Sequence, residues 1–271
     1  DTWLLQAPEG RIRAECNSFA KDFNTDCHFF SYPSEMMTIP DHILTFDQPV
    51  ILVGASPVSV APVLSRLPAG WPLIAADGGA NMLLDLGRRP DMVIGDMDSA
   101  STLPDNLPCM VLDGQDDTDL QKCLARIETP LLVGLACLDG RFDHSLAAIH
   151  ALMTLRHDRP VMLVGAHDVV LRIRGECAFV AEAGCRVSVW PLGRQAFGVS
   201  DGLCWQLDGL TMAAGLMIGT SNKAQGGMVH IRPSQTGSSA KTQPDDDGYV
   251  VIVPNRCLPS LLEALLPSLS N

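Results

Sequence analysis

The sequence predicts an α/β chain in which a doubly wound, mainly parallel sheet is followed by an antiparallel, β-rich part. Two observations support this fold class. Between about residues 50 and 164, short apolar runs alternate with helix-like stretches, which is the order expected for strand–helix units in a parallel sheet. From residue 169 onward, short runs rich in β-branched and aromatic residues follow one another between glycine turns, which favours an antiparallel sandwich or barrel.

The elements expected in the first part follow from its apolar runs. The expected strands cover residues 50–53, 72–76, 92–94, 109–112, 131–136 and 161–164, and the last of them closes the parallel sheet. The expected helices between them cover residues 82–86, 120–127 and 145–156. In the second part, examples of the expected strands are residues 169–173, 186–190, 203–207, 228–232 and 249–253.

The domain organisation predicted from this pattern has three parts. Residues 1–48 form an N-terminal extension of unknown role, residues 49–166 an α/β domain, and residues 167–271 a β-rich domain with an acidic loop at 234–248. Met36 and Met37 lie just before the first expected strands. We therefore expect residues 1–35 to lie outside the working domain.

Four motifs that contain aspartate follow expected strands, either directly or within a few residues. They are Asp77-Gly78-Gly79-Ala80-Asn81, Gly95-Asp96-Met97-Asp98-Ser99, Gln115-Asp116-Asp117-Thr118-Asp119 and Gly140-Arg141-Phe142-Asp143-His144. Because the loops at the carboxyl ends of parallel strands open on one edge of a sheet, these motifs are expected to meet in one crevice. Carboxylates so close together repel one another unless a cation lies between them. The sequence thus predicts a site for magnesium and phosphate.

Each motif also has a simpler interpretation when it is considered alone. Gly78 and Gly79 are typical of a tight turn. Asp117 or Thr118 is a suitable N-cap for the helix that follows it, and Asp143 is a suitable N-cap for the next helix. An isolated Asp-x-Asp is more often a solvated turn than a metal site. Capping gives no reason for aspartate, asparagine, threonine, arginine and histidine to gather on one edge, so the shared site is favoured.

In order and spacing, the four motifs resemble the thiamin pyrophosphokinase (thiamin diphosphokinase) family. The family pattern runs Asp-Gly-Gly-Ala-Asn, Pro-Asp before Gly-Asp-x-Asp-Ser, Asp-x-Thr-Asp, and Gly-Arg-x-Asp-His, and here Pro90 and Asp91 precede the second motif. The resemblance covers about residues 50–232 and is weaker at 202–207 and 219–222. It implies transfer of the diphosphoryl group of ATP to the thiamin hydroxyl, which gives thiamin diphosphate and AMP. It also implies a C-terminal β-sandwich and a homodimer with active sites between subunits.

The residues expected to carry this chemistry fall into three groups. The catalytic group is Asp96, Asp98, Asp119, Arg141 and Asp143, of which Asp96, Asp98 and Asp119 are expected to hold Mg²⁺. The ATP-binding group is Asp77, Gly78, Gly79, Asn81, Gln115, Thr118, Lys122, Arg141 and His144. The resemblance implies a thiamin-binding group of Trp205, Ser221 and Asn222.

Several roles within these groups stay open. Asp119, with Asp77 as a second candidate, either completes the metal shell or orients the thiamin hydroxyl, and the sequence does not assign the catalytic base. Trp205 is suited to stacking on a cationic thiazolium, although a tryptophan in a strand is more often part of the core. Ser221 and Asn222 are equally typical of a turn.

Composition restricts the partners. The formal net charge is −12, the isoelectric point is near 4.8 and the chain has four lysines, so nucleic acid is not expected as a partner. There is no Gly-x-x-x-x-Gly-Lys-Ser/Thr loop, so phosphate charge is expected to be met by metal and arginine.

No apolar run approaches the roughly 18 residues that a membrane helix requires. The nine cysteines form no Cys-x-x-Cys pair, which is typical of reduced, packing cysteines, and the expected location is cytoplasmic.

Two alternative functions stay open from the sequence. One is another magnesium-dependent nucleotide diphosphotransferase or a nucleotide hydrolase that uses the same site. The other is a catalytically silent sensor of thiamin or nucleotide.

Overall fold

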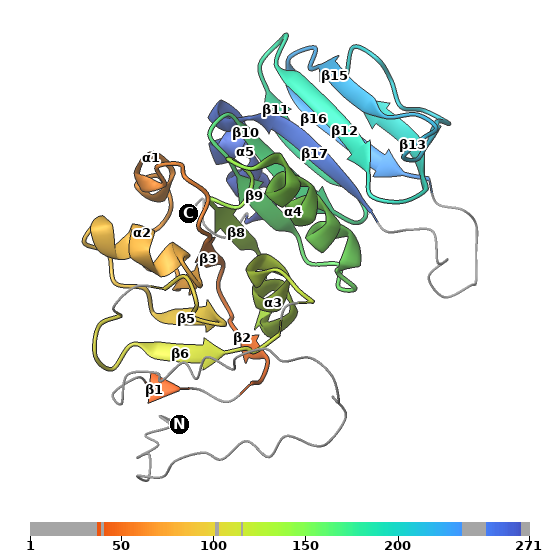
Figure 1. Cartoon of the computed structure of the whole chain (residues 1–271). Helices are drawn as coiled ribbons and strands as arrows, with labels where there is room; N and C mark the ends of the chain where they lie inside the picture. Colours follow the sequence, from red (N-terminus) through yellow and green to blue (C-terminus); the bar gives the residue numbers. More distant parts are fainter. Residues whose placement is uncertain (1–36, 39–40, 101–102, 115, 235–247, 267–271) are drawn as a thin grey trace, which may run out of the picture. The chain divides into compact units, whose positions relative to one another are not determined.

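The computed structural model describes residues 37–38, 41–100, 103–114, 116–234 and 248–266, which belong to one compact unit (Figure 1). Its first part has strands β1 (Met37–Thr38), β2 (Leu44–Thr45), β3 (Val50–Val53), β4 (Leu73–Ala76), β5 (Met92–Gly95), β6 (Pro108–Val111), β7 (Ile127–Glu128), β8 (Leu132–Leu135) and β9 (Val161–Val164). The helices of this part are α1 (Ala61–Leu64), α2 (Gly79–Asp85), α3 (Asp119–Arg126) and α4 (Phe142–Thr154).

The second part is mostly β-strand. Its strands are β10 (Asp168–Ile173), β11 (Cys177–Ala181), β12 (Arg186–Pro191), β13 (Gln195–Asp201), β14 (Thr211–Met212), β15 (Gly219–Lys223), β16 (Gly227–Pro233) and β17 (Tyr249–Pro254). A short 3₁₀ helix η1 (Asn255–Cys257) and helix α5 (Leu258–Leu265) follow.

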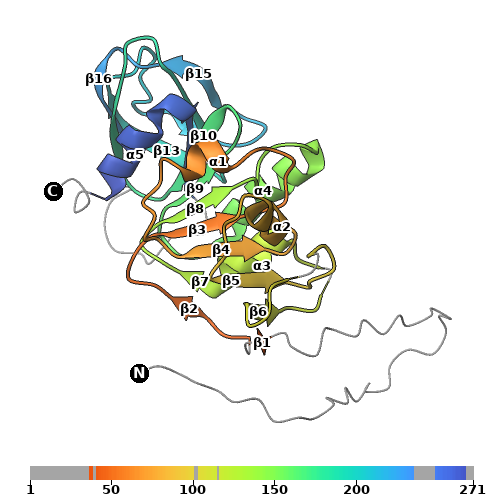
Figure 2. The ribbon, with the colours of Figure 1, turned by 90° about the vertical axis from the view of Figure 1, so that its left-hand side faces the viewer.

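The first part is a doubly wound sheet, as the sequence predicts. Strands β6, β5, β4, β3, β8 and β9 are neighbours in this order and all pair in parallel (Figure 2). Alternate residues of β3 pack into two cores: Ile51 and Val53 lie in the same core cluster as residues of α1 and α2, while Val50 and Leu52 lie with residues of α3 and α4. Helices therefore cover both faces of this sheet, and its strands are buried apolar runs for that reason.

The second part is an antiparallel β-sandwich that continues the same sheet. Strand β9 pairs in parallel with β8 and antiparallel with β10, and β10, β17, β12 and β15 extend the sheet to eleven strands. A second sheet, in the order β11-β16-β13-β14, packs against this extension. Phe197 of the second sheet contacts Tyr249 of the first edge to face, with ring centroids 5.3 Å apart. The predicted domain boundary at 166/167 falls between β9 and β10, and the division into domains stays a prediction.

One expected strand is wrong. Residues 203–207 form bent, irregular backbone in which Leu203 makes an isolated bridge with Ala224. Gly202, at φ +77°, approaches the carbonyl oxygen of Met228 so closely that a Cβ would lie 2.1 Å from it. Beyond it, the backbone N–H of Leu207 donates to Ser200 Oγ, at 2.7 Å. A side chain therefore satisfies this backbone group, and no neighbouring strand is required.

Some expectations fall where the structure gives no description. Residues 1–36, residues 235–247 of the predicted acidic loop, and Gln115 lie outside the described residues. Expectations for these positions stay predictions. Among the residues that are described, no helix has the length and apolar character needed to span a membrane.

Candidate active site

A cavity of about 610 Å³ lies at the carboxyl ends of the parallel strands. This volume is within the usual range for sites that hold small molecules. Residues that follow β3, β5 and β8 line it, together with the starts of α3 and α4. From the expected site residues, the lining includes Asp96, Asp98, Thr118, Asp119, Lys122, Arg141 and His144. The structure thus brings three of the four motifs into one cleft, as the strand-end argument predicts.

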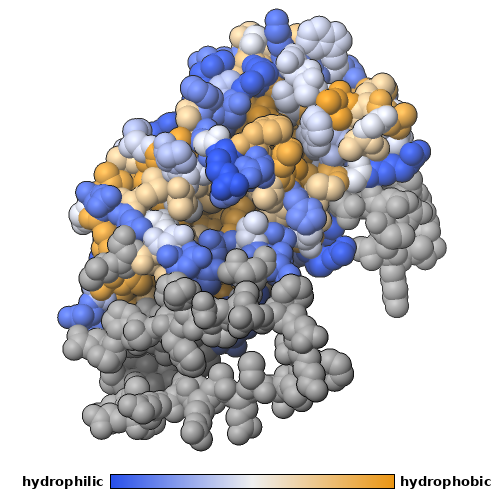
Figure 3. All heavy atoms as spheres, in the orientation of Figure 1, coloured by the Kyte–Doolittle hydropathy of each residue, from blue (hydrophilic) through white to orange (hydrophobic). Residues whose placement is uncertain are grey.

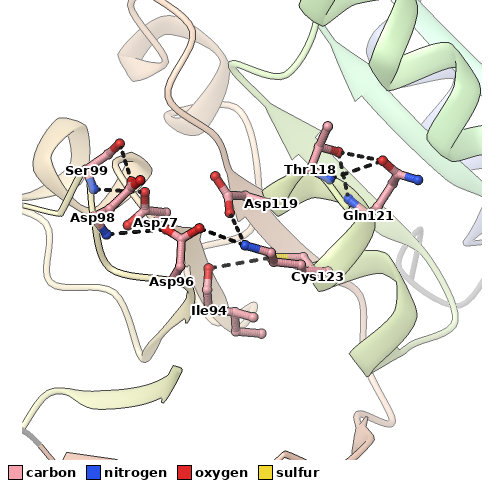
Figure 4. A network of polar contacts seen from close by, with 10 residues as sticks. Asp77, Ile94, Asp96, Asp98, Ser99, Thr118, Asp119, Gln121 and Cys123 are labelled. Carbon is pink, nitrogen blue, oxygen red and sulfur yellow. Dashed lines mark hydrogen bonds and ion pairs between the residues drawn. The ribbon is translucent and has the colours of Figure 1, made fainter. Parts of the chain in front are cut away.

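Three carboxylates form a compact cluster at this cleft. Asp77, at the end of β4, and Asp96 and Asp98, after β5, each present an oxygen within 4.8 Å of the other two (Figure 4). Met97 adopts φ +64° between the two aspartates and turns the chain there. Ser99 Oγ donates to Asp98 Oδ1, at 2.8 Å. Such a set of oxygen donors fits a hard cation such as Mg²⁺.

Asp77 has an acceptor atom without a partner. Its side chain is 1% exposed, and Oδ2 accepts a hydrogen bond from the backbone N–H of Ser99, at 3.2 Å. Its other oxygen, Oδ1, is buried and receives no hydrogen bond. Since a buried carboxylate oxygen is costly without a partner, this atom fits a ligand to a cation in the cluster.

Two glycines allow the cluster to form. A Cβ on Gly95, at φ +156°, would lie 2.7 Å from Asp77 Cβ, and a Cβ on Gly79 would lie 2.0 Å from the carbonyl oxygen of Val53. The second motif therefore needs glycine for close packing of β4 and β5, and the first needs it to pack α2 on β3.

Gly78 and Gly79 are buried and do not line the cavity. Asn81 donates through Nδ2 to the carbonyl oxygen of Ser99, at 2.9 Å. Binding of ATP by these three residues stays a prediction.

Lys122 provides a buried positive charge within the acidic site. Its Nζ lies 2.9 Å from Asp96 Oδ2 and 3.4 Å from Asp119 Oδ1. Burial would raise the pKa of Asp96, but the hydrogen bond from Lys122 holds it below its ordinary value. Burial disfavours the charged lysine, yet its bonds to Asp96 and Asp119 raise the pKa of Lys122. At neutral pH the cluster therefore contains a fixed ammonium group.

Asp119 differs from the other carboxylates. It lies in the first turn of α3, its side chain is 39% exposed, and burial raises its pKa above the ordinary value despite Lys122. Thr118, directly before it, is the N-cap of α3 and forms a capping box with Gln121. The simpler interpretation of Thr118 as a helix cap is confirmed, and the residue also lines the cleft.

The start of α4 supplies exposed groups at the cleft. Arg141 Nε lies 3.1 Å from Asp143 Oδ1, and both side chains are more than half exposed. The hydrogen bond between them raises the pKa of Arg141 and lowers that of Asp143. An exposed ion pair is weak and opens readily, so Arg141 is available to a phosphate group. The N-cap of α4 is Arg141, so Asp143 is not the cap.

Phe142, between these two residues, is 75% exposed. It is an apolar residue that the sequence did not single out. The sequence did contain an indication of its exposure, because a phenylalanine inside a polar loop motif does not occupy an expected core position.

The expected thiamin-binding residues lie in the β-sandwich and do not line the cavity. Trp205 is 60% exposed, so it is not the core residue that a strand position would suggest. Asn222 is buried and holds the Trp205 backbone: its Oδ1 accepts from Trp205 N–H, at 3.1 Å, and its Nδ2 donates to Trp205 carbonyl oxygen, at 2.7 Å. Ser221 lies at φ +61° in β15, and its N–H donates to Ser188 Oγ. These contacts present Trp205 at the surface.

Asp77 is expected to make the stability of the metal-free protein depend on pH. Burial raises the pKa of Asp77 to about 6 from 3.8, and the charge of Asp119 adds to this effect. Because the folded pKa exceeds the unfolded one, the contribution of Asp77 to stability is fully present below about pH 4 and is lost as pH rises through about 6. Relative to Asp77→Asn, we expect the wild-type free energy of unfolding without divalent cation to rise by about 1–1.5 kcal/mol from about pH 7.5 to about pH 5. Chemical denaturation in the presence of a chelator measures this, and equal pH slopes for the two proteins would contradict it.

Comparisons with known proteins bear on the family to which the chain belongs. Residues 70–164 match the family model described as the catalytic domain of thiamin pyrophosphokinase. Thiamine pyrophosphokinase 1 of Oryza sativa subsp. japonica is 30% identical over 210 residues, which cover 61% of this chain and 80% of the rice protein. Thiamin pyrophosphokinase 1 of Caenorhabditis elegans is 27% identical over 183 residues, which cover 60% of this chain and 75% of that protein.

Solved structures support the fold. Thiamin pyrophosphokinase from Geobacillus thermodenitrificans superposes with a TM-score of 0.59 at 19% identity, over 78% of this chain and all of that one. The yeast enzyme superposes with a TM-score of 0.59 at 16% identity, over 84% of this chain and 93% of that one. These structures share the fold, and the rice protein adds sequence identity over most of its length. On these grounds, the chain belongs to the thiamin pyrophosphokinase family.

Proposed function

We propose that this enzyme transfers the diphosphoryl group of ATP to the hydroxyl of thiamin, giving thiamin diphosphate and AMP. The observation that carries the proposal is the cluster of Asp77, Asp96 and Asp98, which lies at the same cleft as Lys122 and Arg141. Phosphoryl chemistry depends mainly on positioning and on neutralising charge. The cluster supports a magnesium site and the two basic residues provide positive charge for phosphate.

In this proposal Asp96 and Asp98 hold Mg²⁺, with Asp77 or Asp119 completing the shell. Bound magnesium would neutralise phosphate oxygens and orient the polyphosphate. Lys122 fixes the positions of Asp96 and Asp119 through its two ion pairs. Arg141 presents a planar set of donors suited to phosphate oxygens.

The proton of the thiamin hydroxyl needs an acceptor near the point of attack on the β-phosphorus. A carboxylate with a raised pKa accepts a proton better than an ordinary one, and Asp77 and Asp119 both have raised pKa values. Asp77 is 1% exposed, whereas Asp119 lines the cavity with a partly exposed side chain. Asp119 is therefore the better candidate for the base.

One incubation tests the reaction. The protein is mixed with ATP, Mg²⁺ and thiamin, and AMP, ADP and thiamin diphosphate are separated. We expect AMP and thiamin diphosphate in equal amounts. Release of ADP would indicate hydrolysis or transfer of a single phosphoryl group, and binding of ligand without turnover would indicate a sensor; either result would reject the proposal.

We also propose that the chain acts as a homodimer in which the β-sandwich domain, residues 167–271, of one subunit supplies the thiamin surface for the α/β domain, residues 49–166, of the other. The described residues that line the cleft include no tryptophan or tyrosine, while Trp205 is exposed on the sandwich. Apolar side chains are also exposed nearby in the chain, at Leu216, Met217 and Ile218, and Figure 3 shows apolar surface in the region of β13. Together with the exposed Phe142 at the cleft, these residues support contact with a second copy. A cytoplasmic location is part of the proposal and rests on the cysteine pattern of the sequence.

A mixing experiment tests the shared site. Asp98→Asn and Trp205→Ala are each expected to be nearly inactive, because one lacks a metal ligand and the other lacks the stacking surface. In a mixed dimer one of the two sites has both residues intact, so mixed dimers purified through both tags are expected to regain about half of the wild-type activity per dimer. The measurement is thiamin diphosphate formation by the co-purified, differently tagged pair. If each site were built from one chain, mixing would restore nothing.

A further inference from the structure

We propose that Cys185 and Cys257 form a dithiol that peroxide converts into an intrachain disulfide, which is a modification site outside the active site. Their sulfur atoms lie 3.3 Å apart, although the residues are 72 positions apart in the chain. Of the seven cysteines that the structure describes, these two have their sulfur atoms in direct contact. A disulfide needs about 2.05 Å, so side-chain shifts of about 1.2 Å in total close the gap.

The two cysteines lie on segments that are already held in place. Cys185 ends the turn between β11 and β12, where its N–H donates to the carbonyl oxygen of Glu182 and its own carbonyl oxygen accepts from the N–H of Ala224. Cys257 ends η1 and directly precedes α5. An ion pair between Arg256 and Glu182, 3.9 Å apart, joins the same two segments at the surface. The thiols thus meet because the backbone brings them together.

A bond here would fasten the C-terminal helix to the sandwich. At present α5 is held on β11 by Leu258 and Leu261, which are buried, and by Ser260. Ser260 Oγ accepts from the N–H of Val180 at 3.0 Å and donates to its carbonyl oxygen at 2.6 Å. The disulfide would add a covalent link beside these contacts and would close a loop of 72 residues, which restricts the unfolded chain.

The reaction balances with one hydrogen peroxide. The sulfur of one cysteine attacks the O–O bond, a water molecule leaves and a sulfenic acid forms. The sulfur of the second cysteine then displaces the hydroxyl of that sulfenic acid, a second water leaves and the S–S bond forms. The two thiols lose two electrons and two protons, and the peroxide gains both.

Burial makes this reaction slow in the native protein. It raises the pKa of the Cys257 thiol to about 12, so the reactive thiolate is scarce at neutral pH. Oxidation is expected to proceed when η1 and α5 open transiently by local unfolding. Once formed, the disulfide is shielded by the same burial. The disulfide is therefore expected to form slowly under oxidising conditions and to be reduced slowly afterwards.

Peptide mapping tests the proposal on the full chain. The protein is treated with hydrogen peroxide, or refolded in a glutathione redox buffer, and then alkylated, digested and analysed by mass spectrometry. We expect one peptide pair linked through Cys185 and Cys257, lighter than its parts by two hydrogens. We also expect the melting temperature to rise by about 5–10 °C and to return on reduction.

Matched variants identify the pair. Cys257→Ser and Cys185→Ser are expected to lose both the linked peptide and the thermal shift, whereas Cys177→Ser, at a buried position in β11 away from the pair, is expected to keep them. If a serine variant does not fold, the alanine variant replaces it. Linkage between other cysteines, no linkage after either treatment, or a thermal shift that persists in Cys257→Ala would overturn the proposal.

Discussion

Asp98→Asn is expected to lower the rate of thiamin diphosphate formation by roughly 10²–10³-fold, the range seen when one electrostatic stabiliser of a transition state is removed. Asparagine has nearly the same shape and keeps an oxygen that accepts from Ser99 Oγ, which bonds Asp98 in the wild type. It removes the negative charge from a group whose oxygens lie within 4.8 Å of those of Asp77 and Asp96. The loss is therefore expected in metal binding and catalysis, and the local fold should remain.

Two measurements separate these effects. Without divalent cation, the melting temperature of Asp98→Asn is expected to equal or exceed that of the wild type, because the charge of Asp98 raises the pKa values of Asp77 and Asp119 through repulsion. With Mg²⁺ added, the wild type is expected to gain more stability than the variant, since a cation that binds only the folded state stabilises it. Asp105→Asn, at an exposed position outside the cleft, is the matched control. Near-normal turnover by Asp98→Asn would remove the metal assignment.

The parallel half of the fold was predictable because its strands are buried on both faces. Strands such as β3 and β9 are therefore continuous apolar runs, and their boundaries follow directly from the sequence. Strands β13 and β15 were missed, since Gln195–Asp201 and Gly219–Lys223 mix polar and small residues and depend on partners that are distant in sequence. The strand expected at 203–207 is wrong for the opposite reason: its pattern suits a strand, but side chains accept the hydrogen bonds of Trp205 N–H and Leu207 N–H, and the segment is irregular.

The cleft was predictable to the extent that strand order places loops on one edge. The convergence of Asp96, Asp98 and Asp119 follows from that rule alone. The position of Lys122 did not follow from it, because the ammonium group lies between Asp119, on its own helix, and Asp96, 26 residues earlier. The contact with Asp96 depends on how α3 packs against β5. The spacing of three residues between Asp119 and Lys122 on one helix indicates only the ion pair between those two residues.

Arg172→Met is expected to destabilise the protein by about 2–5 kcal/mol, because it breaks a buried network of hydrogen bonds. Arg172, in β10, is fully buried. Its Nη1 donates to the carbonyl oxygens of His157 and Arg159, at 2.7 and 3.3 Å, and its Nη2 donates to that of Leu155, at 3.1 Å. Methionine fills a similar volume but leaves the buried carbonyl oxygen of Leu155 and the partly buried ones of His157 and Arg159 without this donor. A fully buried acceptor left unsatisfied costs about 1–3 kcal/mol, and a partly exposed one costs less.

The effect is expected to reach the active site through α4. Leu155 is the C-cap of α4, whose first turn carries Asp143 and His144 at the other end. Loss of the Arg172 bonds removes the donor that satisfies this C-terminal carbonyl, so α4 is expected to exchange its amide hydrogens faster in Arg172→Met than in the wild type. Arg88→Met, at an exposed position, removes the same charge from the surface and is expected to change the free energy of unfolding by less than about 0.5 kcal/mol. Urea denaturation and hydrogen exchange measure both variants. Equal losses for Arg172→Met and Arg88→Met would show that net charge, and not the three buried carbonyl bonds, sets the stability of this region.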